Sequence, residues 1–138
     1  MSLKLPPTYR PSEAEPFMNP RMREYFRQKL LRWREEILHE ADETIAALQS
    51  ESLAVPDLAD RAAAETDRSI ELRARDRQRK LLAKIDAALR RIADGTYGYC
   101  EETDEPIELK RLEARPIATL SIDAQERHER AERSHSED

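Results

Sequence analysis

Apolar side chains recur every three or four residues over a long early stretch of the chain, and this repeat constrains the fold more than any other feature. The average spacing of about 3.5 residues is typical of a helix that packs along one narrow seam, as in a coiled coil. Asn19 precedes Pro20, so we expect Asn19 to cap this helix and Pro20 to lie in its first turn. The seam consists of Met22, Phe26, Leu30, Trp33, Ile37, Ala41, Ile45 and Leu48.

A second repeat follows after the segment QSESLAVPD, which interrupts the pattern at residues 49–57. We expect the second helix to begin after Pro56-Asp57 and to end near Asp94, because the following Gly95 is a natural helix stop. Its seam is thinner in the middle, where RARDRQRK is nearly all charged. The apolar members are Leu58, Ala62, Ile70, Ala74, Leu81, Ile85, Ala88 and Ile92.

Two long helices joined by a short break favour an antiparallel hairpin. Residues 20–49 would span ~45 Å and residues 58–94 slightly more, at ~1.5 Å per residue. Such a hairpin has one narrow seam and no other core. The same pattern fits a dimerising coiled coil or part of a helical bundle, so a structural coiled-coil adaptor remains an alternative to a finger that carries a functional tip.

Charge is distributed unevenly along the expected hairpin. Residues 51–67, around the tip, contain five carboxylates and only Arg61 as a cation. Residues 68–92 contain nine lysines and arginines against three carboxylates. An acidic end and a basic shaft suit insertion into a partner, although a charged face is often simply solvated.

The segment DLADRA, residues 57–62, lies at the expected tip. Asp57 occupies the place of a helix N-cap and Asp60 falls in the first turn, where a carboxylate stabilises the helix dipole. Such carboxylates are common at helix starts. The motif therefore gains functional weight only from its position at the end of an acidic hairpin.

The remaining stretches suggest a small base. Residues 1–20 carry five of the eight prolines and should be irregular. Residues 95–120 suit a short β-hairpin, and Ser121 is placed to cap a last helix. This module is too small to fold without support, so it should pack on the base of the coiled coil and on the N-terminal segment. The expected organisation is 1–20 Pro-rich segment, 21–94 hairpin with its tip at 50–62, 95–120 base module, and 121–138 C-terminal helix and tail.

The stretch YGYC, residues 97–100, has the form of a zinc knuckle that has lost its metal. A second cysteine would follow soon after the first in such a knuckle, but Thr103 stands there and the chain has no other cysteine. We therefore predict a mainly α fold: a long antiparallel coiled-coil hairpin, a small zinc-finger-like base and a C-terminal helix.

Composition narrows the function classes. A single cysteine excludes an internal disulfide framework and favours the cytoplasm. No apolar run approaches the ~18 residues that cross a membrane, and the first residues lack the apolar core of a signal peptide. The net charge of −5 disfavours free nucleic acid as the main partner. No glycine-rich phosphate loop or nucleophile–histidine constellation is present, so we do not expect an enzyme.

Together, DLADRA, ELRARDRQRKLLAKI, DGTYGYCE and IELKRLEARPIATLSID resemble the DksA/TraR family over about residues 16–130. The resemblance implies a transcription regulator that binds RNA polymerase, inserts its coiled-coil tip into the secondary channel and alters promoter-complex lifetime without binding DNA itself. A hairpin that pairs with itself needs no partner chain, so we expect a monomer. It also implies that Asp57, Asp60 and Ala62 are the functional tip residues, and that Arg77 contacts polymerase from the shaft.

The resemblance further implies an effector and a metal. Family members that respond to the alarmone ppGpp, the signal of the stringent response, bind it with basic residues at the positions of Lys84 and Arg115, which are kept, and of Gln125, which replaces a lysine. The four cysteines of zinc-bearing members correspond to Cys100, Thr103, Ser121 and Ala124. One thiol, two hydroxyls and a methyl group do not make a tetrahedral zinc site, so we expect no zinc and no required cofactor. The segment would instead be held by packing, hydrogen bonds and ion pairs among Glu101, Asp104, Lys110 and Arg111.

Overall fold

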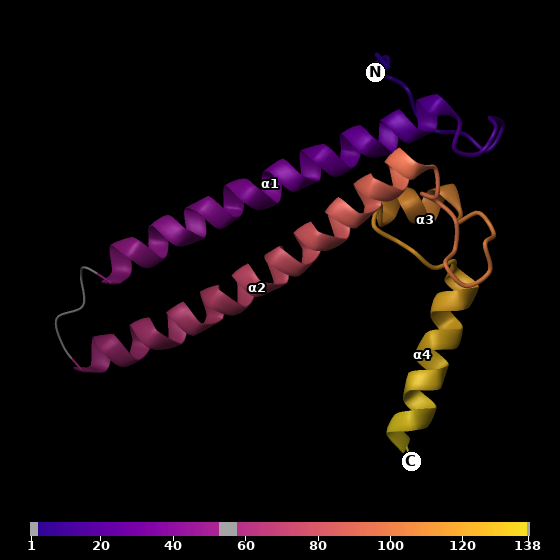
Figure 1. Cartoon of the computed structure of the whole chain (residues 1–138). Coiled ribbons are helices and arrows are strands. Elements are labelled where there is room, and N and C mark those ends of the chain that lie inside the picture. The colour runs from indigo at the N-terminus through magenta and orange to yellow at the C-terminus, as the bar shows by residue number, and fades with distance from the viewer. Residues whose placement is uncertain (1–2, 53–57, 138) are drawn as a thin grey trace. The chain divides into compact units, whose positions relative to one another are not determined.

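The protein is mainly helical, as the sequence predicts. The computed structural model describes residues 3–52 and 58–137, which form α1 (Pro20–Ser52), α2 (Leu58–Asp94), α3 (Leu109–Ala114) and α4 (Ile122–Glu137) (Figure 1). The described residues contain no strand, only an isolated antiparallel bridge. No helix among them is long and apolar enough to cross a membrane.

The chain divides into two compact units. One unit comprises Met1–Leu30 and Ala87–Asp138, which we call the base, and the other comprises Leu31–Asp86, which we call the hairpin. Helices α1 and α2 therefore each contribute to both units.

Within the hairpin, the segments of α1 and α2 run side by side in opposite directions (Figure 1). Arg34 of α1 donates a hydrogen bond to Asp86 of α2 at 3.0 Å, and Ile37 and Ile85 are buried. Farther along the two helices the predicted seam is weaker. Ile70, expected in the seam, is 54% exposed, whereas the next residue, Glu71, is half-buried.

The base has a small core drawn from helices and loops. Met22, Phe26 and Leu30 of α1 are buried. They share this unit with six other buried residues from α2, the loop that follows it, α3 and α4: Ala88, Ile92, Tyr97, Ile107, Leu112 and Ala124.

The ends of the helices follow local sequence signals. The side chain of Asn19 accepts a hydrogen bond from the Met22 N–H at 2.9 Å, so it caps α1 as predicted. The Ser121 hydroxyl accepts one from the Ala124 N–H at 3.2 Å and caps α4. Helix α2 ends at Asp94, and Gly95 follows with a positive φ of 86°. The Thr96 N–H then donates to the Arg91 carbonyl at 2.9 Å, in the manner of a Schellman cap.

The β-hairpin expected in the base is reduced to the single bridge between Tyr99 and Pro106. The Cys100 N–H donates to the Glu105 carbonyl and the Ile107 N–H donates to the Gly98 carbonyl, each at 2.8 Å. Because α2 ends at Asp94 and α3, a helix that we did not expect, begins at Leu109, only a short segment remains for extended pairing.

Candidate functional site

The tip motif starts α2. Asp57 lies outside the residues that the structure describes. Asp60 is in the first turn of α2, and both Asp60 and Ala62 are exposed. A carboxylate in this turn interacts favourably with the helix dipole. Asp60 can therefore stabilise the start of α2 and also present a charge to another molecule.

The shaft carries a mixture of paired and unpaired cations. Asp76 forms an ion pair with Lys80 at 3.3 Å and contacts Arg79. Hydrogen bonds from Lys80, the charge of Lys80 and a hydrogen bond from Arg79 hold the pKa of Asp76 below its usual value. Arg77 follows Asp76 in the sequence. It is exposed and has no hydrogen-bond or ion-pair partner among the described residues. Its guanidinium is therefore available to another molecule.

The three positions expected to hold ppGpp lie in different parts of the chain. Lys84 is exposed and belongs to the hairpin unit. Arg115 and Gln125 belong to the base, where Arg115 is the exposed residue at the C-terminal end of α3. Gln125 is half-buried in the first turn of α4, and its amide donates to Glu129 at 3.2 Å.

Two of the other positions equivalent to zinc ligands, Thr103 and Ser121, lie beside Cys100, which is buried. Burial raises the pKa of this thiol. Hydrogen bonds from the Thr103 hydroxyl and from the backbone N–H groups of Ser121, Thr103 and Glu102 outweigh burial and lower the pKa to about 6. Donors from the loop that follows Cys100 and from Ser121 therefore surround this buried sulfur and favour its negative charge.

Ion pairs around this loop differ from our expectation. No ion pair joins Glu101, Asp104, Lys110 and Arg111 within the described part of the chain. Glu102 instead contacts His128 and Arg127 of α4, the latter at 3.9 Å. Arg111 donates to the Leu120 carbonyl at 2.8 Å. The base therefore ties α4 to the loop through Glu102, and ties α3 to the loop before α4 through Arg111.

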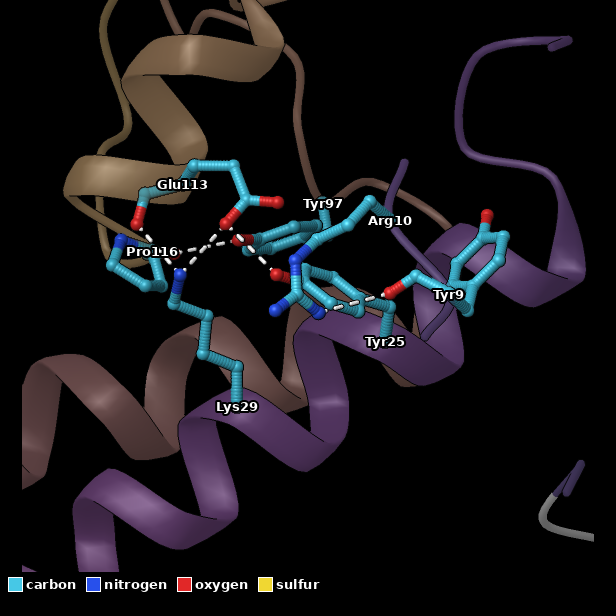
Figure 2. A network of polar contacts seen from close by, with 7 residues as sticks. All are labelled: Tyr9, Arg10, Tyr25, Lys29, Tyr97, Glu113 and Pro116. Carbon is cyan, nitrogen blue, oxygen red and sulfur yellow. Dashed lines mark hydrogen bonds and ion pairs between the residues drawn. The ribbon is translucent and has the colours of Figure 1, made fainter. Parts of the chain in front are cut away.

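A polar network that the sequence did not reveal holds α3 on α1 (Figure 2). Lys29 forms an ion pair with the Glu113 carboxylate at 2.8 Å and donates to the Glu113 carbonyl at the same distance. The Tyr25 hydroxyl donates to the same carboxylate at 2.9 Å. The partners lie more than eighty positions apart, and no local pattern connects them.

The N-terminal segment packs on the base through aromatic rings and a glycine. The Phe17 ring meets the Tyr99 ring edge-on with 5.4 Å between centroids. The Arg21 guanidinium lies 4.6 Å from the centre of the Tyr9 ring. Gly98 has a φ of 92°, and a β-carbon there would come within 3.0 Å of the Met18 side chain. The glycine therefore permits both the turn and the close approach of Met18.

Two protein-family models match the chain and together cover most of it. The N-terminal domain of the DnaK suppressor protein DksA matches residues 22–92. The prokaryotic dksA/traR C4-type zinc finger matches residues 95–130.

Known proteins align over nearly the same span. The RNA polymerase-binding transcription factor DksA of Caulobacter vibrioides (strain NA1000 / CB15N) is 68% identical over 130 residues, which is 94% of this chain and 92% of that protein. The protein of that name from Escherichia coli (strain K12) is 44% identical over 115 residues, which is 83% of this chain and 76% of that protein. The structure of transcription factor DksA2 from Pseudomonas aeruginosa superposes with a TM-score of 0.81 at 44% identity, covering 89% of this chain and 93% of that one.

The residues present do not fit the zinc ion that the second family model implies. A C4-type finger needs four thiolates, whereas the four positions here provide the Cys100 thiol, the Thr103 and Ser121 hydroxyls and the Ala124 methyl group. Ser121 is already committed to capping α4 and Ala124 is fully buried. Within residues 3–52 and 58–137, no group of three or more histidine, cysteine or acidic side chains is placed to hold a metal ion.

Proposed function

Because the chain belongs to the DksA/TraR family, we propose that it is a transcription regulator that acts by binding RNA polymerase directly. The observation that carries this proposal is the 68% identity, over 94% of the chain, to a protein named as an RNA polymerase-binding transcription factor. The family is one of transcription factors and not of enzymes.

We further propose that the hairpin enters the secondary channel of the polymerase and alters the stability of promoter open complexes. Exposed Asp60 and Ala62 at the start of α2 support this mode of action. Arg77 on the shaft supports it too, because its side chain has no partner among the described residues. In this mode of action, the carboxylates of the tip act as negative charges near the catalytic magnesium of the polymerase, and Arg77 contacts the polymerase from the shaft. The protein itself makes no sequence-specific contact with DNA.

The alternative, a structural adaptor or dimeriser, predicts that a second chain fills the seam. Ile37 and Ile85 are buried within a single chain, and Arg34 of one arm pairs with Asp86 of the other. These contacts favour a hairpin that pairs with itself and acts as a monomer.

The alarmone ppGpp is the effector that we propose, at a site shared with polymerase. Lys84 and Arg115 would supply cations to this polyanion, and both are exposed with no side-chain partner among the described residues. Gln125 supplies no charge, and its amide is engaged by Glu129. We therefore expect a weaker response to ppGpp than a chain with lysine at this position would give.

Zinc independence is the last part of the proposal. We expect the buried sulfur of Cys100 and its hydrogen-bond donors to organise the loop that four cysteines organise in a C4-type finger. The network of Lys29, Tyr25 and Glu113 secures the neighbouring α3. Regulation by this protein would then persist when zinc is scarce.

The lifetime of promoter complexes tests the role of the tip. We expect Asp60→Asn to keep polymerase binding and to lose most of the effect on lifetime, because asparagine preserves size and helix-start character but removes the charge. Asp67→Asn is the matched control, since Asp67 is exposed on nearly the same face of α2 about two turns farther along. An unchanged lifetime effect for Asp60→Asn, or an equal loss in both variants, would contradict the proposed role.

A further inference from the structure

Burial along the hairpin is uneven. Close to the two chain ends of this unit, Leu31 and Asp86, the side chains of Ile37 and Ile85 are only 4% and 0% exposed. Farther toward the other end, Ala41, Ile45 and Ala74 are half-buried. Ile70 and Leu72, on either side of half-buried Glu71, are 54% and 48% exposed, so neither covers the seam there. The apolar contact that holds the two arms together therefore fades along the hairpin.

Two polar residues occupy the seam of α2 where this contact fades. Positions 71, 74, 78, 81 and 85 follow the three–four spacing of the seam, and Glu71 and Gln78 hold two of them. The Oε2 atom of Glu71 and the Oε1 atom of Gln78 are both buried and have no hydrogen-bond partner within the described residues. A buried polar atom without a partner opposes the closed state, since the same atom is hydrated when the arms separate.

Packing beside Gln78 is also incomplete. Gln78 and Ala41, from opposite arms, line a groove of about 350 Å³ together with Leu72, Arg75, Asp76, Arg79 and Leu82. Water can enter this groove, and the short side chain of Ala41 covers little of it. Less apolar area is therefore buried between the arms here than a filled seam would bury, and the closed state is favoured less.

We propose that Glu71 and Gln78 make the distal part of the hairpin, residues 41–52 and 58–78, an opening segment. Its two arms separate and re-pair while the arms at Ile37 and Ile85 stay closed. The two polar residues lie seven positions apart, and so on one face of α2, so a single opening event exposes both to water. This inference concerns the hairpin by itself and does not depend on the proposed function.

Amide hydrogen exchange measured by mass spectrometry tests the proposal in two ways. In the wild-type chain, we expect amides in residues 58–74 to exchange at least about tenfold faster than those in residues 81–92, where a tenfold ratio corresponds to about 1.4 kcal/mol. In the double variant Glu71→Leu/Gln78→Leu, exchange in residues 41–52 and 58–74 should slow by about tenfold or more. Leucine has a helix propensity close to that of glutamate and glutamine, so the change acts on the seam and not on the helix itself.

The matched control is Glu65→Leu/Gln49→Leu, which replaces the same residue types at exposed positions of the hairpin, one on α2 and one on α1. We expect its exchange to remain close to that of the wild type. All variants are compared at a concentration at which light scattering shows that each has the same molar mass in solution as the wild type. Equal slowing in both double variants, no slowing in the seam variant, or uniform exchange along wild-type α2 would overturn the proposal.

Discussion

The Tyr97 hydroxyl donates a hydrogen bond of 2.8 Å to the carbonyl oxygen of Pro116 (Figure 2). Tyr97 is 1% exposed, and burial raises the pKa of its hydroxyl above the ordinary value. The bond joins the loop after α2 to the segment after α3. The base thus uses a buried side chain to connect two loops.

Replacement of Tyr97 by phenylalanine should therefore destabilise the protein. Tyr97→Phe leaves the Pro116 carbonyl without this donor, at an expected cost of ~1–3 kcal/mol in the free energy of unfolding. Tyr99→Phe is the control, because Tyr99 is 37% exposed and its hydroxyl has no hydrogen-bond partner among the described residues. Denaturant titration measures both, and equal stabilities of the two variants would contradict this account.

The two glycines of the chain should respond differently to alanine. Gly95 and Gly98 both have positive φ, so each substitution costs about 1–2 kcal/mol in backbone strain. A β-carbon at Gly95 meets nothing within 4 Å, whereas one at Gly98 meets Met18 at 3.0 and 3.1 Å and Phe17 at 3.2 Å. We predict that Gly98→Ala lowers the free energy of unfolding by roughly 1 kcal/mol or more beyond Gly95→Ala. Thermal denaturation of the pair checks this, and a larger loss at Gly95 would refute it.

The stability of the protein should depend on pH through Cys100. The folded pKa of about 6 lies below the value of about 8.5 for a thiol in an unfolded chain. The thiolate therefore contributes stability that is fully present above the unfolded pKa and is lost as pH falls toward 6. The difference in unfolding free energy between wild type and Cys100→Ser should widen from pH 6 to pH 8.5. A difference that stays constant or narrows would show that the thiol is not ionised in the fold.

Removal of metal should leave the fold intact. The donor set around Cys100 does not suit zinc, so we predict that the purified protein contains less than stoichiometric zinc and keeps its thermal transition in EDTA. Elemental analysis and calorimetry provide the measurements. A zinc-bearing four-cysteine relative serves as the positive control, and loss of folding of the present chain in chelator would show that a metal holds it.

Local chemistry explains what could be predicted from the sequence. The cap at Asn19, the stop at Gly95 and the cap at Ser121 each depend on a few adjacent residues. The 3.5-residue repeat likewise predicts the two long helices, because the spacing directly encodes which side chains share a face.

Features that depend on distant residues could not be predicted. The pairing of Lys29 with Glu113 and the donors around Cys100 arise only when separate segments meet. The exposure of Ile70 was also missed, because periodicity identifies a face but not how completely another helix covers it. Among the candidate site residues, Asp60, Ala62 and Arg77 are exposed as their proposed roles require.

The proposed mode of action depends most directly on where the tip lies in the complex with polymerase. A photo-crosslinking amino acid in place of Asp60, with the same group in place of exposed Glu105 in the base as a control, maps the contacts of each end. We predict that position 60 crosslinks to polymerase residues that line the secondary channel near the catalytic magnesium, and that position 105 does not. Crosslinks from position 60 only to the outer surface of polymerase, or to a second copy of this chain, would contradict the account.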